Sequence, residues 1–445
     1  MAFPSRAFLV VLAGMATTTI AVADDDFRLM SEPTSFTDVA DAADEGDPFD
    51  LNVHVAFRRT ALSSTIRRET TSPEARGRLL DIADFEHTRN ELELGLDIGL
   101  YRDVMAYLRF PLVLSDTRDL SFPAGTSPED IQARLLTQPP GAGQEAVPLF
   151  TLPFNSATRS GVESITAGFA FSVLNQTRRR HVPTWTFLLE GRFGIGTIMN
   201  PCAPDAERCN PGVSEGTHSI RAESRLSRRY RFVELYSGIG YTFAWAGRAK
   251  DRFEPSGSLS GFVNRRPPMR GDFTVGASFV PWENRAAEQR FSFDVRARAA
   301  YVSEGRIYSP LFDALGSSQS PYLTTPNLEG IPNGSDLRSV AFNGLTDAQD
   351  RTEFGGTLAI ELRAARYVRF RFGADLDFIS AFFITDADAC NTGVNPREGD
   401  ARTCFGANGI INPHHRAVID VPGQRFQQGA SFRYRLFLQA TAQVW

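Results

Sequence analysis

"LELGLDIGLYRDVMAYLRFPLVLS", residues 92–115, alternates apolar and polar side chains on both sides of a three-residue interruption. This period of two predicts two β-strands, and residues 101–103 between them leave room only for a tight hairpin. One face of the pair is mostly aliphatic, whereas the other carries ionisable groups that include Glu93, Asp97 and Arg109. Two environments suit such a sheet: water outside a soluble core, or lipid outside a wet lumen.

The beginning of the chain is typical of a secretory signal. Arg6 precedes the apolar run 7–16, and "AVA" at 21–23 offers the small residues that a signal peptidase requires. We expect cleavage before Asp24. No later stretch approaches the roughly 20 apolar residues of a transmembrane helix, so the lipid-facing alternative calls for strands. The composition, with 36 glycines, 35 phenylalanines and 26 prolines, suits strands and turns.

Twelve segments alternate with a period of two, and each is about as long as the roughly 9 to 11 residues that cross a bilayer, or longer. Their connections are alternately long, as at 59–85 and 116–162, and short, as at 101–103 and 175–183. This rhythm is typical of outer-membrane barrels, whose external loops can grow while the periplasmic turns stay tight. We therefore predict an all-β fold, a transmembrane antiparallel barrel of about 12 strands in a bacterial outer membrane. The predicted strands are 49–58, 86–100, 104–115, 163–174, 184–198, 218–227, 232–245, 269–279, 290–302, 354–363, 367–380 and 430–445.

Three parts of the chain are predicted: a signal peptide at 1–23, an acidic leader at 24–48 and the barrel at 49–445. Between Asp24 and Asp50 the chain carries ten acidic residues against Arg28 alone. Such a run is typical of a solvated, disordered tail. The alternative is a plug that folds into an arginine-lined lumen.

The four tryptophans lie near the ends of proposed strands, where amphipathic rings favour the headgroup region. Trp185, Trp245, Trp282 and Trp445 are the predicted aromatic belt. The last segment, "SFRYRLFLQATAQVW", ends on an aromatic residue and resembles the C-terminal signal of bacterial outer-membrane barrels, which implies the barrel-assembly machinery as a partner. Polar residues share the phase of Trp445, and this departure predicts a twist or bulge near the end.

The opening hairpin also resembles a known family. "ELELGLDIGLYRDVMAYLRFPLVLS", with a glycine before its short turn and a proline in its return strand, is similar to a unit of the outer-membrane channel family linked to the meta-pathway of phenol degradation. The likeness covers about 25 of the 445 residues. It implies the fold class more than any substrate.

Four cysteines in an exported chain suggest two disulfides. Proximity pairs Cys202 with Cys209 and Cys390 with Cys404, although three pairings are formally possible. Both pairs fall in long connections, which are expected outside the cell.

No catalytic, metal or cofactor site is predicted. His414 and His415 could bind a transition metal, but an exposed pair of histidines is more often incidental. His218 and Ser219 point to opposite faces of a strand, and Ser224, which shares the phase of His218, lies roughly 20 Å along it. The segment 127–136 is predicted to form a short helix, either on the surface of a loop or folded into the mouth as a constriction.

With the apolar phase facing lipid, charged residues of seven strands point inward. The predicted lumen-lining residues are Asp50, Glu91, Glu93, Asp97, Arg109, Glu190, Arg192, Arg296, Arg298, Arg363, Arg369, Arg371 and Asp375. The arginines of the ninth to eleventh strands are expected to stand apart from the carboxylates of the first two and to impose a transverse field. The alternative is that the opposite charges pair across and close the lumen. Inward glycines are expected to leave the pore open, because they fill no space; these are Gly168, Gly194, Gly196, Gly238, Gly240, Gly276 and Gly373.

The function predicted from these features is an outer-membrane channel for the passive or facilitated passage of small solutes, without enzymatic activity. The expected partners are outer-membrane lipid and a small solute that the sequence does not identify; nucleic acid is not expected. Two alternatives stay open, namely an outer-membrane barrel enzyme acting on lipids and a closed barrel that serves as an anchor or interaction module.

Overall fold

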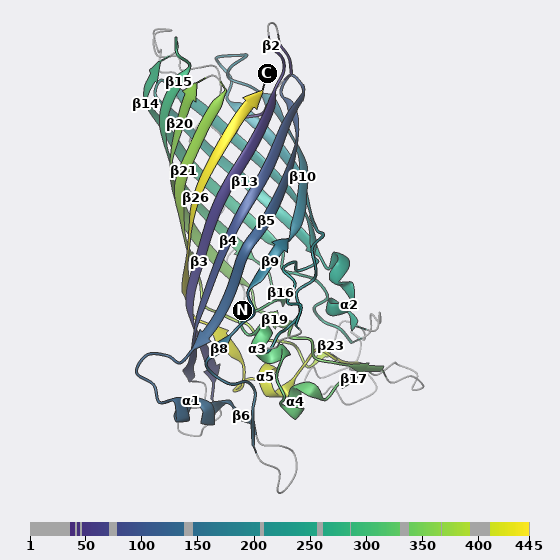
Figure 1. Ribbon diagram of the computed structural model, residues 1–445. Helices are drawn as coiled ribbons and strands as arrows, with labels where there is room; N and C mark the ends of the chain where they lie inside the picture. The colour runs from purple at the N-terminus through teal and green to yellow at the C-terminus, as the bar shows by residue number, and fades with distance from the viewer. Residues whose placement is uncertain are drawn as a thin grey trace, which may run out of the picture.

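The chain folds into a closed barrel of twelve antiparallel strands (Figure 1). The computed structural model describes residues 36–40, 42–44, 47–70, 78–137, 146–204, 209–255, 261–284, 286–329, 338–365, 367–391 and 410–444. Each barrel strand pairs with its neighbours in sequence, and β26 pairs with β3 to close the cylinder. The barrel strands are β3 (Leu51–Glu69), β4 (Leu79–Tyr101), β5 (Val104–Ser121), β10 (Ser164–Leu174), β11 (Thr184–Gly194), β12 (His218–Tyr230), β13 (Val233–Trp245), β14 (Arg270–Asn284), β15 (Gln289–Val302), β20 (Arg351–Ala365), β21 (Val368–Ile379) and β26 (Ser431–Val444). The predicted fold class is confirmed.

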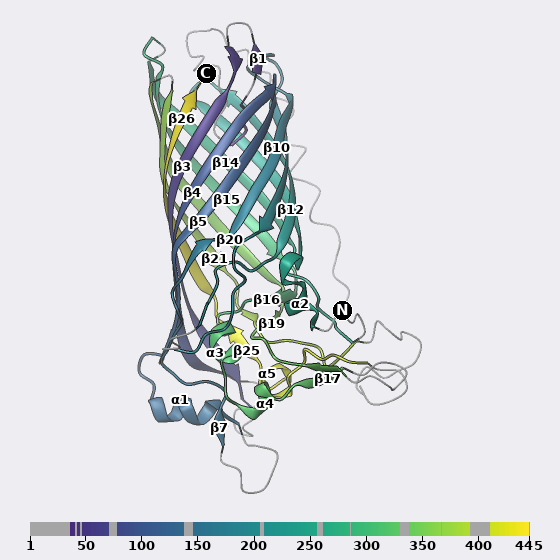
Figure 2. The same cartoon turned by 45° about the vertical axis from the view of Figure 1, so that its right-hand side comes forward.

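The short connections gather at one end of the barrel and the long ones at the other (Figure 2). Three of the short turns contain a residue in the left-handed region, namely Arg102, Arg231 and Glu288, with φ of 35°, 54° and 51°. One expected long connection was wrong: most of 59–85 belongs to β3 and β4. These strands continue beyond the part whose alternate residues face lipid, because Ile66 and Ile82 pack into a core formed by the loops.

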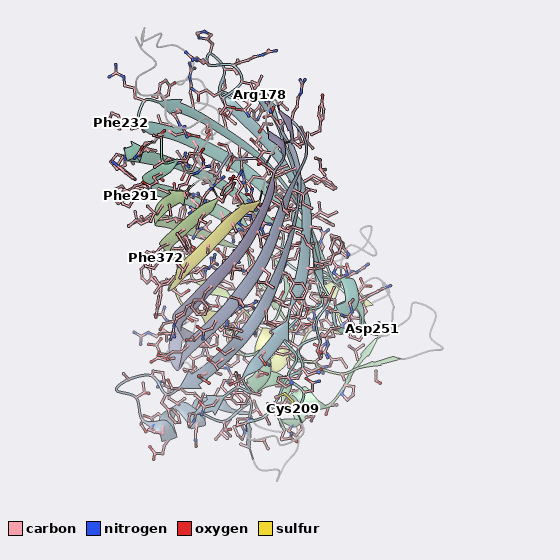
Figure 3. The ribbon with its side chains drawn as sticks, turned by 45° about the horizontal axis from the view of Figure 1, so that its top comes forward. Arg178, Cys209, Phe232, Asp251, Phe291 and Phe372 are labelled. Atoms are coloured by element: carbon pink, nitrogen blue, oxygen red, sulfur yellow. A yellow bond between two sulfur atoms is a disulfide. The ribbon has the colours of Figure 1, made fainter. Side chains whose placement is uncertain are left out.

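The outer surface of the barrel is apolar. Ile239 and Leu358 are each 64% exposed, and Figure 3 shows Phe291 and Phe372 on the outside of the wall. A soluble protein would not leave such a continuous belt in water. Trp185 and Trp282 also face outward. Trp282 lies near the end of β14, which continues to Asn284. Trp445 lies outside the described residues.

The predicted bulge near the C-terminus was wrong. β26 pairs with β3 from Phe432 to Val444 without a register shift. The alternate residues that include Gln439 and Thr441 face the lumen along the whole strand. No bulge is therefore needed to turn these polar residues away from lipid.

A two-stranded hairpin lies at the short-turn end, beside the described C-terminus (Figure 2). It comprises β1 (Ala42–Asp44) and β2 (Asp47–Phe49). The backbone N–H of Arg102 donates to the carbonyl of Ala42, which joins the hairpin to the β4–β5 turn.

The long connections fold together beyond the opposite end of the barrel. Their largest apolar cluster includes Ile131, Leu149, Leu315 and Ile419. Within the described residues, no helix has the length and apolar character needed to cross a membrane. The elements of these connections are α1 (Pro128–Leu135), β6 (Leu136–Thr137), β7 (Val147–Pro148), β8 (Phe154–Asn155), β9 (Arg159–Val162), η2 (Gly247–Ala249), α2 (Lys250–Phe253), β16 (Gly305–Ile307), α3 (Phe312–Gly316), α4 (Pro321–Thr324), β17 (Asn327–Glu329), β18 (Arg338–Val340), β19 (Thr346–Ala348), β22 (Phe382–Phe383), β23 (Cys390–Asn391), β24 (Ile410–Ile411), α5 (Ala417–Asp420) and β25 (Phe426–Gln428).

Helix α1 is the helix expected at 127–136. Ser127 caps it by accepting a hydrogen bond from the backbone N–H of Asp130. Ile131 and Leu135 are fully buried in the loop core, and no residue of α1 lines the cavity inside the barrel. The helix therefore belongs to the outer loops and does not constrict the lumen.

Candidate functional site

The lumen is lined by charged side chains that alternate with the lipid-facing residues. On β26, Arg433 and Arg435 point inward, whereas Tyr434 and Leu436 are exposed on the outside. This separation follows from the pleat of a strand, which sends successive side chains to opposite faces. The same alternation brings arginines from seven strands to one interior surface.

A cavity of about 740 Å³ occupies the barrel interior. Eleven arginines and eight carboxylates line it, so arginine predominates at its surface. The lining residues are Phe36, Asp38, Ala40, Asn52, His54, Arg58, Glu93, Asp97, Met105, Tyr107, Arg109, Leu188, Glu190, Arg221, Glu223, Arg225, Arg270, Asp272, Thr274, Arg296, Arg298, Glu361, Arg369, Arg371, Asp377, Arg433, Arg435, Gln439 and Thr441.

The structure places eight of the thirteen residues predicted for the lumen on the lining of this cavity. They are Glu93, Asp97, Arg109, Glu190, Arg296, Arg298, Arg369 and Arg371. The other five lie beside it. Asp50 accepts a hydrogen bond from Gln443, Glu91 pairs with Arg58, Arg192 pairs with Glu163, Arg363 lies 3.7 Å from Glu288, and Asp375 accepts a hydrogen bond from Thr357.

The expectation of two separated charge groups was wrong, because each group has its own counter-ions. Arg298 lies 2.7 Å from Asp377, and Arg371 lies 2.7 Å from Asp294. In the group of carboxylates on the first strands, Glu93 lies 2.5 Å from Arg58. The charges thus neither oppose one another across the lumen nor stand unpaired, and the strong transverse field is not expected.

Several of these contacts join strands that are not adjacent, and a glycine lies between them. Gly355 of β20 is paired in register with Arg298 of β15 on one side and with Asp377 of β21 on the other. A Cβ at Gly355 would lie 1.9 Å from the Asp377 carboxylate. The missing side chain therefore lets Arg298 and Asp377 meet across the intervening strand.

The same arrangement recurs with tyrosine. Gly168 lies between Tyr107 and Glu190, which share a 2.9 Å hydrogen bond over it, and a Cβ there would lie 2.4 Å from the tyrosine ring. The prediction that such glycines leave space unfilled was wrong for five of the seven, since neighbouring side chains cover Gly168, Gly238, Gly240, Gly276 and Gly373. A side chain that covers a glycine in this way lies against the barrel wall.

His54 of β3 forms hydrogen bonds to both neighbouring strands, β26 and β4. One ring nitrogen, Nδ1, lies 2.8 Å from the Thr441 hydroxyl, and Nε2 bonds to the Asp97 carboxylate, which also pairs with Arg109 at 2.5 Å. Sequence reasoning missed His54, although it shares the inward phase of Arg58 on β3.

The other histidines noted in the sequence form no comparable group. The Gly194 N–H donates to Nδ1 of His218, whereas the Ser224 hydroxyl accepts a hydrogen bond from the Trp185 indole, so the structure does not bring His218 and Ser224 together. His414 packs on Phe262, and burial lowers its pKa well below the usual range. The described residues contain no cluster of three histidine, cysteine or acidic side chains that could hold a metal ion.

Residues 36–40 of the leader lie inside the barrel, among side chains near the short turns. The Phe36 ring stacks on Tyr236, with centroids 4.6 Å apart, and the guanidinium carbons of Arg225 and Arg296 lie 4.9 and 4.8 Å from its centre. Asp38 lies 3.1 Å from Arg369. A basic and aromatic interior thus accommodates an aromatic and an acidic residue of the leader.

A disulfide closes a short segment of one outer loop, and a buried ion pair joins two of the outer loops. Cys202 and Cys209 form a disulfide in the β11–β12 connection, and Figure 3 shows Cys209 among the outer loops. The partner predicted for Cys390, Cys404, lies outside the described residues. Arg159 is fully buried and contacts Asp313 of α3 at 2.6 Å.

No protein-family model matches the chain, and no curated protein matches it. Among solved structures, similarity was found to an outer membrane channel from Pseudomonas putida F1 designated COG4313, at 11% identity and a TM-score of 0.39, covering 90% of this chain and 100% of that one. The outer membrane protease OmpT from Escherichia coli is 6% identical, with a TM-score of 0.31 and coverage of 89% and 97%. A FadL homologue from Pseudomonas aeruginosa is 8% identical, with a TM-score of 0.32 and coverage of 88% and 90%.

Proposed function

We propose that the protein is an outer-membrane channel for small solutes, with a preference for anions. The observation that supports this most directly is the arginine-rich cavity inside a closed barrel whose outer face is apolar. Guanidinium groups that lie along a wall provide repeated, shallow sites for an anion, and conduction requires sites that bind weakly enough to release. Carboxylates behind the arginines, such as Asp294 and Glu353, moderate the preference.

Charge selectivity is tested by recording single channels in planar bilayers under a salt gradient. Wild-type protein is expected to conduct with a reversal potential that favours anions. Replacing Arg369 and Arg371 together by alanine should shift selectivity toward cations, because two cations leave the lining. Arg59→Ala is the matched control, since Arg59 is exposed on the outer face of β3; it should leave selectivity unchanged.

Two results would count against this proposal. If wild-type protein shows no conductance, the closed anchoring barrel is favoured, and lipid hydrolysis by the purified protein would favour the enzyme instead. An equal change of selectivity in Arg59→Ala would mean that the lumen does not set it.

We further propose that the leader narrows the pore at the short-turn end. Phe36 and Thr37 are 5% and 1% exposed among luminal side chains, so this segment occupies space that a solute would cross. Deleting residues 24–48 should therefore increase single-channel conductance. Asp38→Asn, which weakens the contact with Arg369 but keeps the segment, should increase it less; equal conductance of the deletion variant and wild type would contradict a plug.

A further inference from the structure

A second cavity, of about 550 Å³, lies outside the barrel lumen at the loop end. Its volume is in the range that suits a small molecule. The ends of β3 and β4 form one side, and α1, α4 and the segment around α5 form the others. The lining residues are Arg68, Glu69, Thr70, Leu80, Ile82, Arg134, Leu136, Thr137, Tyr322, Ala417, Val418, Gly423 and Gln424.

Arg68 is a buried cation on the wall of this cavity, and it has only neutral partners. It is 8% exposed. Its guanidinium donates to three backbone carbonyls, those of Arg134 at 2.7 Å, Val418 at 3.0 Å and Gln424 at 3.3 Å. Its carbon lies 5.0 Å from the centre of the Phe426 ring. A guanidinium has five N–H donors, so two remain for another acceptor.

The carboxylate nearest in sequence does not neutralise Arg68. Glu69 accepts hydrogen bonds from Arg425 at 2.8 and 3.0 Å and from the Gly423 N–H at 2.7 Å. Within the described part of the chain, no ion pair of Arg68 or Arg134 is found. Arg134 is exposed in the last turn of α1. The cavity thus presents two guanidinium groups without an ion pair among the described residues, beside the Glu69 carboxylate, which Arg425 binds.

The rest of the wall is largely apolar. It is lined by Leu80, Ile82, Val418 and the aromatic side chain of Tyr322. Leu136, which is 44% exposed, also lines it. A ligand that fits both halves has one anionic group and an apolar body. Burying a charge is costly unless it is paired and hydrogen-bonded, and a carboxylate matches a guanidinium in charge and in planar geometry.

We propose that this outer cavity binds a small organic monocarboxylate, with its carboxylate at Arg68 and its apolar body against Leu80, Ile82 and Val418. Binding stands independently of the channel activity. Only its role in capturing a solute before passage rests on the proposed function, so loss of conductance and loss of binding are separate outcomes.

The test is calorimetric titration of the full chain in lipid nanodiscs, with empty nanodiscs subtracted. Octanoate is the probe, octanol is its neutral counterpart and acetate is its counterpart without the tail. Octanoate should bind on the order of tenfold more tightly than octanol, because a hydrogen-bonded charge pair is lost in the alcohol. Acetate should also bind more weakly, since it leaves the apolar wall in water.

Three variants separate binding from folding. Arg68→Gln should weaken octanoate binding on the order of tenfold or more. Arg67→Gln is its control, because Arg67 pairs with Asp81 outside the cavity. Leu136→Trp fills the cavity but keeps every bond of Arg68, so it should also weaken binding. Protease resistance of the loops reports on folding in each variant.

The proposal is overturned if octanoate binds equally to wild type and Leu136→Trp, or if octanol binds as tightly as octanoate. Equal binding of acetate and octanoate would show a simple anion site, and the apolar part of the proposal would then be wrong.

Discussion

Replacing Asp313 by alanine is expected to destabilise the outer loops by about 3 to 5 kcal/mol, since it leaves Arg159 buried without its counter-ion. Arg159 lies in β9 and has no exposed surface. Asp313 also accepts a hydrogen bond from the backbone N–H of Cys202. One carboxylate therefore joins three long connections, and its loss should be detected as faster hydrogen exchange and proteolysis in all three.

Two variants make this result specific. Asp251→Ala removes a carboxylate from an exposed position in α2 and should change stability by less than about 0.5 kcal/mol. Replacing Arg159 by methionine together with Asp313 by leucine removes both charges, and such a swap is often close to neutral. If Asp313→Ala costs no more than Asp251→Ala, the buried pair does not hold the loops together.

Placing arginine at Ile239 should destabilise the barrel by about 2 to 4 kcal/mol in a bilayer, because a charge near the midplane of the lipid is costly. Ile239 lies at the middle of β13 and is the most exposed large apolar side chain of that strand, at 64%. Reversible unfolding of the protein in vesicles by urea measures the difference.

Phe232→Arg is the control for the position within the bilayer. Phe232 is exposed in the β12–β13 turn, which Figure 3 shows at the rim of the barrel. Arginine near an interface costs only about 0 to 1 kcal/mol. Equal costs at the two sites would mean that β13 does not cross a hydrocarbon layer at Ile239.

The strands were predictable from the sequence because lipid and lumen impose opposite preferences on alternate residues. The prediction failed where that contrast ends. The outer parts of β3 and β4 contact loops on one face, so apolar and polar residues no longer alternate there in the lipid-facing pattern. The segment 59–85 was therefore predicted as a loop. The loop core had no periodic signal at all, since its apolar residues come from three long connections and from the ends of barrel strands.

Inward positions were predictable, but contacts between them were not. The alternation along each strand shows that Arg298 and Asp377 face the lumen. Their pairing, however, depends on the register of two strand pairs and on Gly355 between them. Similarly, His54 meets Thr441 only because the first and last barrel strands are neighbours. A glycine on the inward phase between a cation and an acid in register would have been the signal to look for.

The closure of the barrel through β3 and β26 also sets an order of assembly. Loop closure becomes more costly as the joined residues lie farther apart in the chain, and His54 and Thr441 are 387 positions apart. Before β26 is added, β3 and β21 each have an unpaired edge that can pair with another chain. A polypeptide truncated before Ser431 should therefore be prone to aggregation even though eleven strands are already present.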